Sequence, residues 1–296
     1  MQRSLIIILS LVALSVQAKS PYEIIDNSPD SAWRDLNPED TLYITLETGV
    51  VVVKLAPEFA PNHVDNTKKL VREGVFDNTS FYRVVDGFVA QGGPAEPEKI
   101  AKPKNGKLTI DAEFTVKPNK PLDFTAIGLI DGYAPQTGFV DGFAAAYDKQ
   151  KGEYWMTHCY GTMAMGRGNS ANSGGTELYI VIGSAQRYLD KNTTVFGRVI
   201  TGMEPIQHLK RSSNLKGAVD MKGKNKIISI KVASDLKPED RMALQTMKTN
   251  SQSFKDIIES RKNRNGEWFL YQHNYIDVCS VAVPVRLKNV KVKSFN

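Results

Sequence analysis

Residues 81–93 read FYRVVDGFVAQGG, and this stretch is the most informative part of the sequence about the fold. Two short, mostly apolar runs flank an Asp-Gly pair at residues 86–87, which predicts two strands joined by a tight turn. Arg83 and Gln91 stand among small and apolar neighbours, with Phe88 between them. Strand alternation alone leaves open which side chains share a face, because a bulge or bend at residues 86–87 would change the register. Taken alone, the stretch also fits an arginine in a surface salt bridge and a glutamine bonded to backbone.

Strand signals continue on both sides of this stretch. Runs of alternating or β-branched residues predict further strands at residues 43–46, 50–55, 107–110, 162–165, 177–182, 194–200 and 227–232. One helix is predicted between Pro61 and Gly74, since proline favours the first turn and glycine the end, and a second at residues 205–211. Many short strands, two helices and abundant turns predict a mainly β protein, with a closed β-barrel capped by the helices.

Three segments surround or interrupt the predicted barrel domain of residues 40–234. Residues 19–39 are predicted to be an irregular lead-in. At about residues 115–157 glycines alternate with aromatics, which predicts an ordered insertion. We prefer a stabilising flap far from any groove, although a role in client access stays open. Residues 235–296 predict a small α+β extension, with helices at 238–247 and 252–262 and strands at 268–272 and 278–287.

The N-terminal residues have the pattern of a secretory signal peptide. A basic start at Arg3 precedes an apolar run over residues 5–16, and small residues lead to a predicted cleavage point after Ala18. The run is shorter than the ~20 residues of a membrane-spanning helix, although an uncleaved anchor is the alternative. We therefore expect a periplasmic or secreted protein with no membrane span after cleavage.

Charge and histidine patterns give no sign of nucleic acid, metal or cofactor binding. The net charge is +6, and the basic residues are scattered without interleaved aromatics, which is typical of a solvated surface. No Cys/His spacing typical of a metal site occurs. Each of the four histidines stands alone and is expected to be structural or exposed: His63, His158, His208 and His273.

The chain has two cysteines, Cys159 and Cys279. In an oxidising compartment a disulfide between them is plausible, and it would pin the C-terminal segment to the barrel. Two unpaired buried thiols are the alternative, and the sequence leaves both open.

The opening stretch resembles the signature of the cyclophilins, which are peptidyl-prolyl cis-trans isomerases. The family pattern F-x-R-x-x-x-x-F-x-x-Q-G-G is matched without a gap by Phe81, Arg83, Phe88, Gln91, Gly92 and Gly93. Residues 46–81 are similar to the opening hairpin and first helix of the family, and residues 161–206 are similar to its second half. The resemblance covers about residues 40–233 and is interrupted by the insertion. Beyond it, only a likeness to the tails of bacterial secreted members appears.

The resemblance implies a catalytic site and a proline pocket. Arg83 is similar to the catalytic arginine, and Gln91 is similar to the glutamine that holds substrate backbone. The other implied substrate-binding residues are Phe88, Val89, Gly166, Arg167, Tyr179, Tyr188, Leu189 and Thr193. No cofactor is implied.

Several of these positions depart from the family pattern. Gly166 and Arg167 replace an Ala-Asn pair, and Arg167 is expected to favour clients with acidic residues beside the proline. Tyr188 replaces tryptophan, so at most weak cyclosporin binding is expected. Thr193 replaces histidine, which removes an imidazole from the pocket. Glu177 replaces glutamine.

The implied function is rotation of X-Pro peptide bonds in exported proteins, which assists their folding. The partners would be proline-containing polypeptides. The alternative is a binding module that holds proline segments as a chaperone or assembly partner, with little catalysis.

Overall fold

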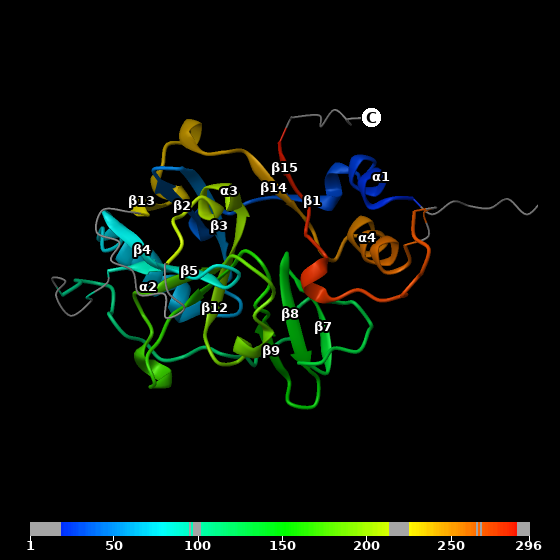
Figure 1. Ribbon diagram of the computed structural model, residues 1–296, viewed down its shortest axis with the longest axis horizontal. Helices are drawn as coiled ribbons and strands as arrows, with labels where there is room; N and C mark the ends of the chain where they lie inside the picture. The colour runs from blue at the N-terminus through cyan, green and yellow to red at the C-terminus, as the bar shows by residue number, and fades with distance from the viewer. Residues whose placement is uncertain are drawn as a thin grey trace, which may run out of the picture.

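A computed structural model describes residues 19–94, 96, 102–212, 225–264, 266 and 268–288; the predicted signal peptide lies outside the described residues. Eight antiparallel strands form a closed barrel in the order β10-β11-β5-β4-β13-β2-β3-β12. Figure 1 labels most of them. This confirms the predicted mainly β, closed-barrel fold. The strands are β2 Thr41–Leu46, β3 Gly49–Leu55, β4 Thr79–Val84, β5 Val89–Gly93, β10 Thr162–Met165, β11 Leu178–Val181, β12 Val195–Thr201 and β13 Lys226–Val232.

The barrel interior is filled by alternate residues of its strands. One buried cluster takes every second residue of β2 and β3: Leu42, Ile44, Leu46, Val51, Val53 and Leu55. Helix α2, Pro61–Arg72, adds Val64, Leu70 and Val71 to the same cluster, and helix α3, Met203–Gln207, adds Ile206. The two helices thus cap the barrel as predicted, because each buries one apolar face against its core.

The insertion is a four-stranded antiparallel sheet in the order β6-β7-β8-β9. Its strands are β6 Phe124–Ala126, β7 Gln136–Val140, β8 Phe143–Asp148 and β9 Glu153–Met156. Phe143 and Met156 of this sheet share an apolar cluster with Val89 and Tyr179 of the barrel. Our preference for a flap far from the groove is therefore wrong, since Val89 and Tyr179 are predicted groove residues.

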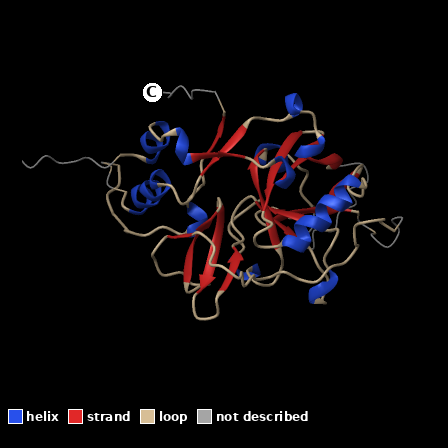
Figure 2. Cartoon of the chain, turned by 180° about the vertical axis from the view of Figure 1, so that it is seen from behind, coloured by secondary structure: helices blue, strands red, loops and turns tan. Residues whose placement is uncertain are grey.

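The two ends of the described chain meet in a third sheet, β1-β14-β15. Strand β14, Leu244–Met247, pairs with β1, Trp33–Asp35, on one side and with β15, Val285–Leu287, on the other. Helix α1, Pro21–Asp26, lies beside α4, Gln252–Lys262 (Figure 1). Seen from behind, these helices and the insertion sheet lie on one side of the molecule and the barrel on the other (Figure 2). A disulfide joins Cys159 to Cys279 across this region.

Several local predictions are wrong, mainly in the terminal segments. The lead-in contains α1 and β1, and the helix predicted at 238–247 is a 3₁₀ turn followed by β14, because pairing on both edges stabilises a strand there. Residues 107–110 and 268–272 form no strand, and residues 278–287 contain a 3₁₀ turn and then β15. The 3₁₀ turns are Asp30–Ala32, Pro38–Asp40, Ala171–Ser173, Arg187–Leu189, Ala233–Asp235, Pro238–Asp240 and Val278–Ser280.

Among the described residues, none of the helices has the length and apolar character needed to cross a bilayer.

Candidate active site

Strands β4 and β5 bring together the three polar and aromatic residues of the opening stretch. Arg83 is the cross-strand partner of Gln91, and its Nη1 donates to the Gln91 Oε1 at 3.3 Å. The Arg83 guanidinium carbon lies 5.6 Å from the centre of the Phe88 ring. The register shifts between Ser80 and Arg83, so the irregularity lies within β4 and not at the turn. A guanidinium is therefore fixed between an amide and an aromatic ring.

Strand β11 supplies the next wall, because it pairs with the other edge of β5. Tyr179 is opposite Gln91, and Val181 is opposite Val89. Val89 and Tyr179 are buried in one apolar cluster, and Phe88 packs against it half-buried. These contacts join three of the predicted pocket residues into one apolar surface next to Arg83.

The remaining predicted residues lie on two loops. Tyr188 and half-buried Leu189 belong to the 3₁₀ turn Arg187–Leu189, and Tyr188 is 57% exposed. Gly166 faces the site without a side chain, because a Cβ there would lie 3.1 Å from the Gln91 Nε2.

Arg167 is exposed and is held by backbone carbonyls of its own loop and of the loop that contains Asn192. Its Nε donates to the Asn192 carbonyl at 2.7 Å, and its Nη1 donates to the Gly168 carbonyl at 2.9 Å. The guanidinium carbon also lies 5.5 Å from the centre of the Phe114 ring. Its charge is thus at the rim and already engaged with protein groups.

A buried imidazole lies behind the pocket wall. The His158 Nε2 is 2.8 Å from the Tyr179 hydroxyl and 3.0 Å from the Thr193 Oγ1, and those two hydroxyls are 2.5 Å apart. Burial raises the pKa of Tyr179, so its hydroxyl stays protonated. Thr193 thus contacts an imidazole that another part of the chain supplies behind the wall, and the expectation that Thr193 removes an imidazole from the pocket itself stays a prediction.

The same buried line of hydrogen bonds continues to the insertion. The His158 Nδ1 is 2.9 Å from the Asp190 Oδ1, and the other Asp190 oxygen accepts from the Arg187 Nε at 2.6 Å. Arg187 also donates two hydrogen bonds of 3.0 Å to Asp131, which precedes β7 in the insertion. The turn that carries Tyr188 and Leu189 is thereby tied to the insertion.

Glu177 lies on the opposite side of Gln91 from Arg83. Its Oε2 accepts from the Tyr82 hydroxyl, and that hydroxyl accepts from the Gln91 Nε2 at 3.1 Å. Burial raises the pKa of Glu177 to about 8. A carboxyl that changes charge near neutral pH is thus linked to the predicted catalytic residues.

Comparison with known proteins identifies the family of this chain. Residues 41–232 match the family described as "Cyclophilin type peptidyl-prolyl cis-trans isomerase/CLD". The chain belongs to this family. Cyclophilin AquaCyp293 from Hirschia baltica is a similar solved structure, with a TM-score of 0.71 and 29% identity over 88% of this chain and 96% of that one.

Curated relatives agree with the structural match. A probable peptidyl-prolyl cis-trans isomerase of Brucella suis is 29% identical over 236 residues, which cover 79% of this chain and 98% of that protein. Peptidyl-prolyl cis-trans isomerase B of Bacillus subtilis is 28% identical over 177 residues, which cover 60% of this chain and 94% of that protein. These relatives and the fold support peptidyl-prolyl cis-trans isomerase activity in this cyclophilin.

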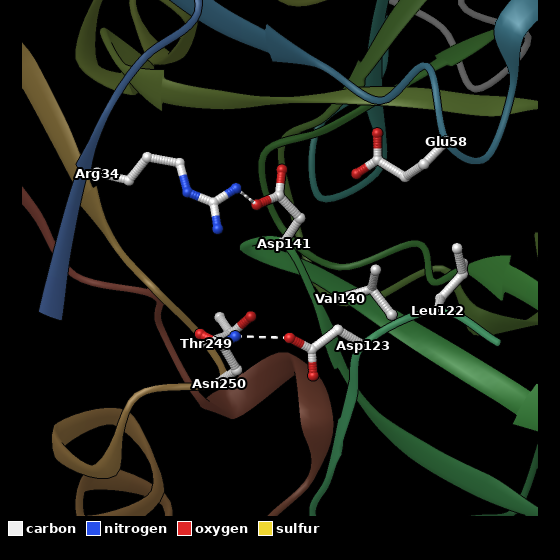
Figure 3. A pocket seen from close by; sticks show the side chains of 8 residues that line it. All are labelled: Arg34, Glu58, Leu122, Asp123, Val140, Asp141, Thr249 and Asn250. Carbon is white, nitrogen blue, oxygen red and sulfur yellow. Dashed lines mark hydrogen bonds and ion pairs between the residues drawn. The ribbon is translucent and has the colours of Figure 1, made fainter. Parts of the chain in front are cut away.

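A separate pocket of about 310 Å³ lies where the barrel, the insertion and both ends of the chain meet (Figure 3). It is lined by Arg34, Glu58, Leu122, Asp123, Val140, Asp141, Thr249 and Asn250. Arg34 is paired with Asp141, and Asn250 donates to Asp123 at 2.5 Å. Burial raises the pKa of Glu58 to about 7. None of the predicted groove residues lines this pocket, and its polar groups are mostly paired with one another.

Sequence reasoning missed Tyr82, His158 and Asp190 as neighbours of the site. Tyr82 precedes Arg83 and would face the other way in a regular strand, and only the register shift in β4 lets both approach Gln91. Tyr179 itself was a usable signal, because the hydroxyl of a tyrosine in an apolar pocket requires a partner. Within the described ranges, no group of three or more histidine, cysteine or acidic residues is arranged to hold a metal ion.

Proposed function

We propose that this cyclophilin rotates X-Pro bonds in exported polypeptides and assists their folding outside the cytoplasm. The observation that carries this proposal is the position of Arg83, between Gln91 and the ring of Phe88 and next to the buried surface of Val89 and Tyr179.

The chemistry explains why an arginine suits this place. An X-Pro bond resists rotation by ~18–20 kcal/mol, because the nitrogen lone pair is delocalised into the carbonyl. Twisting localises that lone pair, and the nitrogen becomes a better hydrogen-bond acceptor. A guanidinium aimed at the nitrogen gains this bond only in the twisted state, so it stabilises the transition state more than the substrate. Arginine is planar and permanently charged, so it can provide this bond at any physiological pH.

The neighbouring groups complete the proposed mechanism. Phe88, Val89 and Tyr179 would hold the proline ring by apolar contact while the acyl side turns. Gln91 keeps Arg83 in place and has a second amide hydrogen for substrate backbone. Each ~1.4 kcal/mol of preference for the twisted state would raise the rate tenfold.

The proposed location rests on residues 1–18, which have the pattern of a secretory signal, and on the Cys159–Cys279 disulfide. Disulfides persist mainly in oxidising compartments such as the periplasm and the extracellular space. We propose proline-containing polypeptides as the clients. Tyr188 in place of tryptophan supports no more than weak cyclosporin binding.

The decisive experiment replaces Arg83 with alanine and, as the conservative control, with lysine. Isomerisation of a blocked Ala-Pro peptide and refolding of a proline-limited client are measured in parallel. We expect Arg83→Ala to lower kcat/KM by about 100-fold, as loss of a transition-state donor does in other enzymes, and to abolish client rescue. Arg83→Lys keeps the charge but loses the planar fork, so an intermediate loss is expected.

The result also separates catalysis from binding. If client rescue survives in Arg83→Ala while peptide turnover disappears, the protein acts as a binding module for proline segments. If peptide turnover itself survives, Arg83 is not the catalytic group.

A further inference from the structure

Four side chains form one continuous line of hydrogen bonds through the site. Arg83 Nη1 donates to the Gln91 Oε1 at 3.3 Å, and the Gln91 Nε2 donates to the Tyr82 oxygen at 3.1 Å. The Tyr82 hydroxyl then donates to the Glu177 Oε2. Every bond therefore runs in the same direction, from the guanidinium to the carboxyl.

The carboxyl at the end of this line is an unusual group to find there. The other Glu177 oxygen, Oε1, is buried and has no hydrogen-bond partner among the described residues. Such a group normally has a partner or gives up its charge. Burial without a second partner thus makes the charged form of Glu177 less favourable than that of a carboxylate in water.

We propose that Glu177 is a positioning residue for the isomerisation, because its carboxylate fixes, through the Tyr82 hydroxyl, the orientation of Gln91 and Arg83. This inference rests on the proposed function.

The charge of Glu177 sets the orientation of the Gln91 amide, because it determines which groups in the line can donate a hydrogen bond. An ionised carboxylate only accepts, so Tyr82 must donate to it, and the Tyr82 oxygen is left to accept from the Gln91 amide. The Gln91 carbonyl then faces Arg83. A protonated Glu177 can donate to Tyr82, so Tyr82 is released to donate elsewhere and the Gln91 amide can turn over. Arg83 would then face an amide NH₂ and lose its acceptor.

Glu177 is the main titratable group in this line of hydrogen bonds, because the groups that face it are neutral or bonded elsewhere. Strand β4 contributes Tyr82, and β5 contributes Gln91, which is neutral, with Arg83 behind it. The residue after β10, Gly166, offers only its backbone N–H, which donates to the Glu177 carbonyl at 2.6 Å. Neighbouring Arg167 is bonded to the backbone carbonyls of Asn192 and Gly168. Burial raises the pKa of Glu177 to about 8, which puts the change within a measurable pH range.

The test measures kcat/KM between pH 6 and 9.5, by exchange NMR on a blocked Ala-Pro peptide without ionisable groups. We expect the wild-type value to rise about fivefold around pH 8, the change that one typical hydrogen bond produces. Glu177→Gln keeps the size of the side chain but cannot ionise, so its profile should be flat. Tyr82→Phe breaks the line, so its profile should be flat although Glu177 is intact.

The matched control is Glu58→Gln, which removes another buried carboxyl with a raised pKa. Glu58 lines the pocket of Figure 3, away from this line, so its variant should keep the step near pH 8. A second readout does not depend on turnover: the NMR signals of the Gln91 side-chain amide should shift with pH in the wild type and in Glu58→Gln. They should not shift in Glu177→Gln or Tyr82→Phe.

The outcomes separate this inference from the proposed function. A flat wild-type profile, or a step that persists in Glu177→Gln or in Tyr82→Phe, overturns the role of Glu177. If the Gln91 signals titrate as expected but the peptide is not turned over at any pH, the proposed function fails while the link from Glu177 to Gln91 holds.

Discussion

Two chains of hydrogen-bonded side chains lie on either side of the same pocket, and they differ in how their charges are balanced. One runs from Arg83 through Gln91 and Tyr82 and ends at Glu177, whose second oxygen has no partner among the described residues. The other runs from Tyr179 to Asp131, and in it Arg187 lies buried between Asp131 and Asp190.

One pocket can therefore have a rigid wall on one side and an adjustable wall on the other. Arg187 forms ion pairs with two buried carboxylates, so the groups behind the pocket are held in one arrangement. Glu177 has no such cation in contact among the described residues, so its charge depends on pH. We therefore expect the hydrogen bonds around Arg187 to govern stability and those that end at Glu177 to govern turnover.

The largest loss of stability should come from Arg187→Met, which breaks the line of hydrogen bonds and ion pairs behind the pocket. Methionine is similarly long but leaves Asp131 and Asp190 buried without their shared cation. Loss of one partner from a buried ion pair costs about 3–5 kcal/mol, and we expect a fall of this size in the free energy of unfolding. Urea unfolding measures it.

The control for this variant is Lys191→Met, which removes an ion pair at the surface. Lys191 lies 3.3 Å from Glu153 and is 38% exposed, so its removal should cost no more than about 1 kcal/mol. Equal losses in the two variants would mean that the buried chain is no more important than a surface pair.

A smaller change in the free energy of unfolding is expected for Glu177→Gln, and this change should depend on pH. The pKa of Glu177 is about 8 in the folded protein, well above the ~4.3 of an exposed glutamate, so the folded state binds the proton more tightly. The stability due to this proton is present below about pH 4 and is lost as pH rises through about 8. Glutamine has no proton to lose.

Relative to the wild type, Glu177→Gln should therefore gain about 1–3 kcal/mol between pH 5 and pH 9. Glu58→Gln should show the same sign, with its change complete nearer pH 7. Urea unfolding at pH 5, 7 and 9 measures both. A Glu177→Gln variant whose stability runs parallel to the wild type would show that the carboxyl is already ionised at pH 5.

The smallest effect should follow Tyr179→Phe. The change removes a hydroxyl that lies 2.8 Å from His158 and 2.5 Å from Thr193, and leaves the ring in place. We expect a loss of about 1 kcal/mol in stability, and kcat/KM within a few-fold of wild type with an unchanged pH profile. Thermal unfolding and the peptide assay measure these quantities. Loss of the step near pH 8 would show that the two chains are coupled.

The sequence predicted the barrel well because its strands and helices have strong local signals. The strand pair around the Asp-Gly turn was correctly predicted, and outside the barrel the α4 helix was predicted with its observed bounds, because its pattern is also local. The signals failed in the terminal segments, where β1, β14 and β15 are short strands stabilised by one another. The roles of Arg83, Gln91 and the pocket residues stay predictions, although the structure brings most of them together.

Local patterns in the sequence were enough to predict the strands of the barrel and to put Arg83 and Gln91, eight residues apart, on two strands joined by one turn. Which side chains meet was fixed by the folded structure, because the register shift in β4 and the strands from distant parts of the chain set which groups surround Gln91. Tyr82 and Glu177 are 95 residues apart, and Cys159 and Cys279 are 120 apart. Contacts over such separations depend on the order and register of all the strands between them, and no local pattern of residues encodes that order.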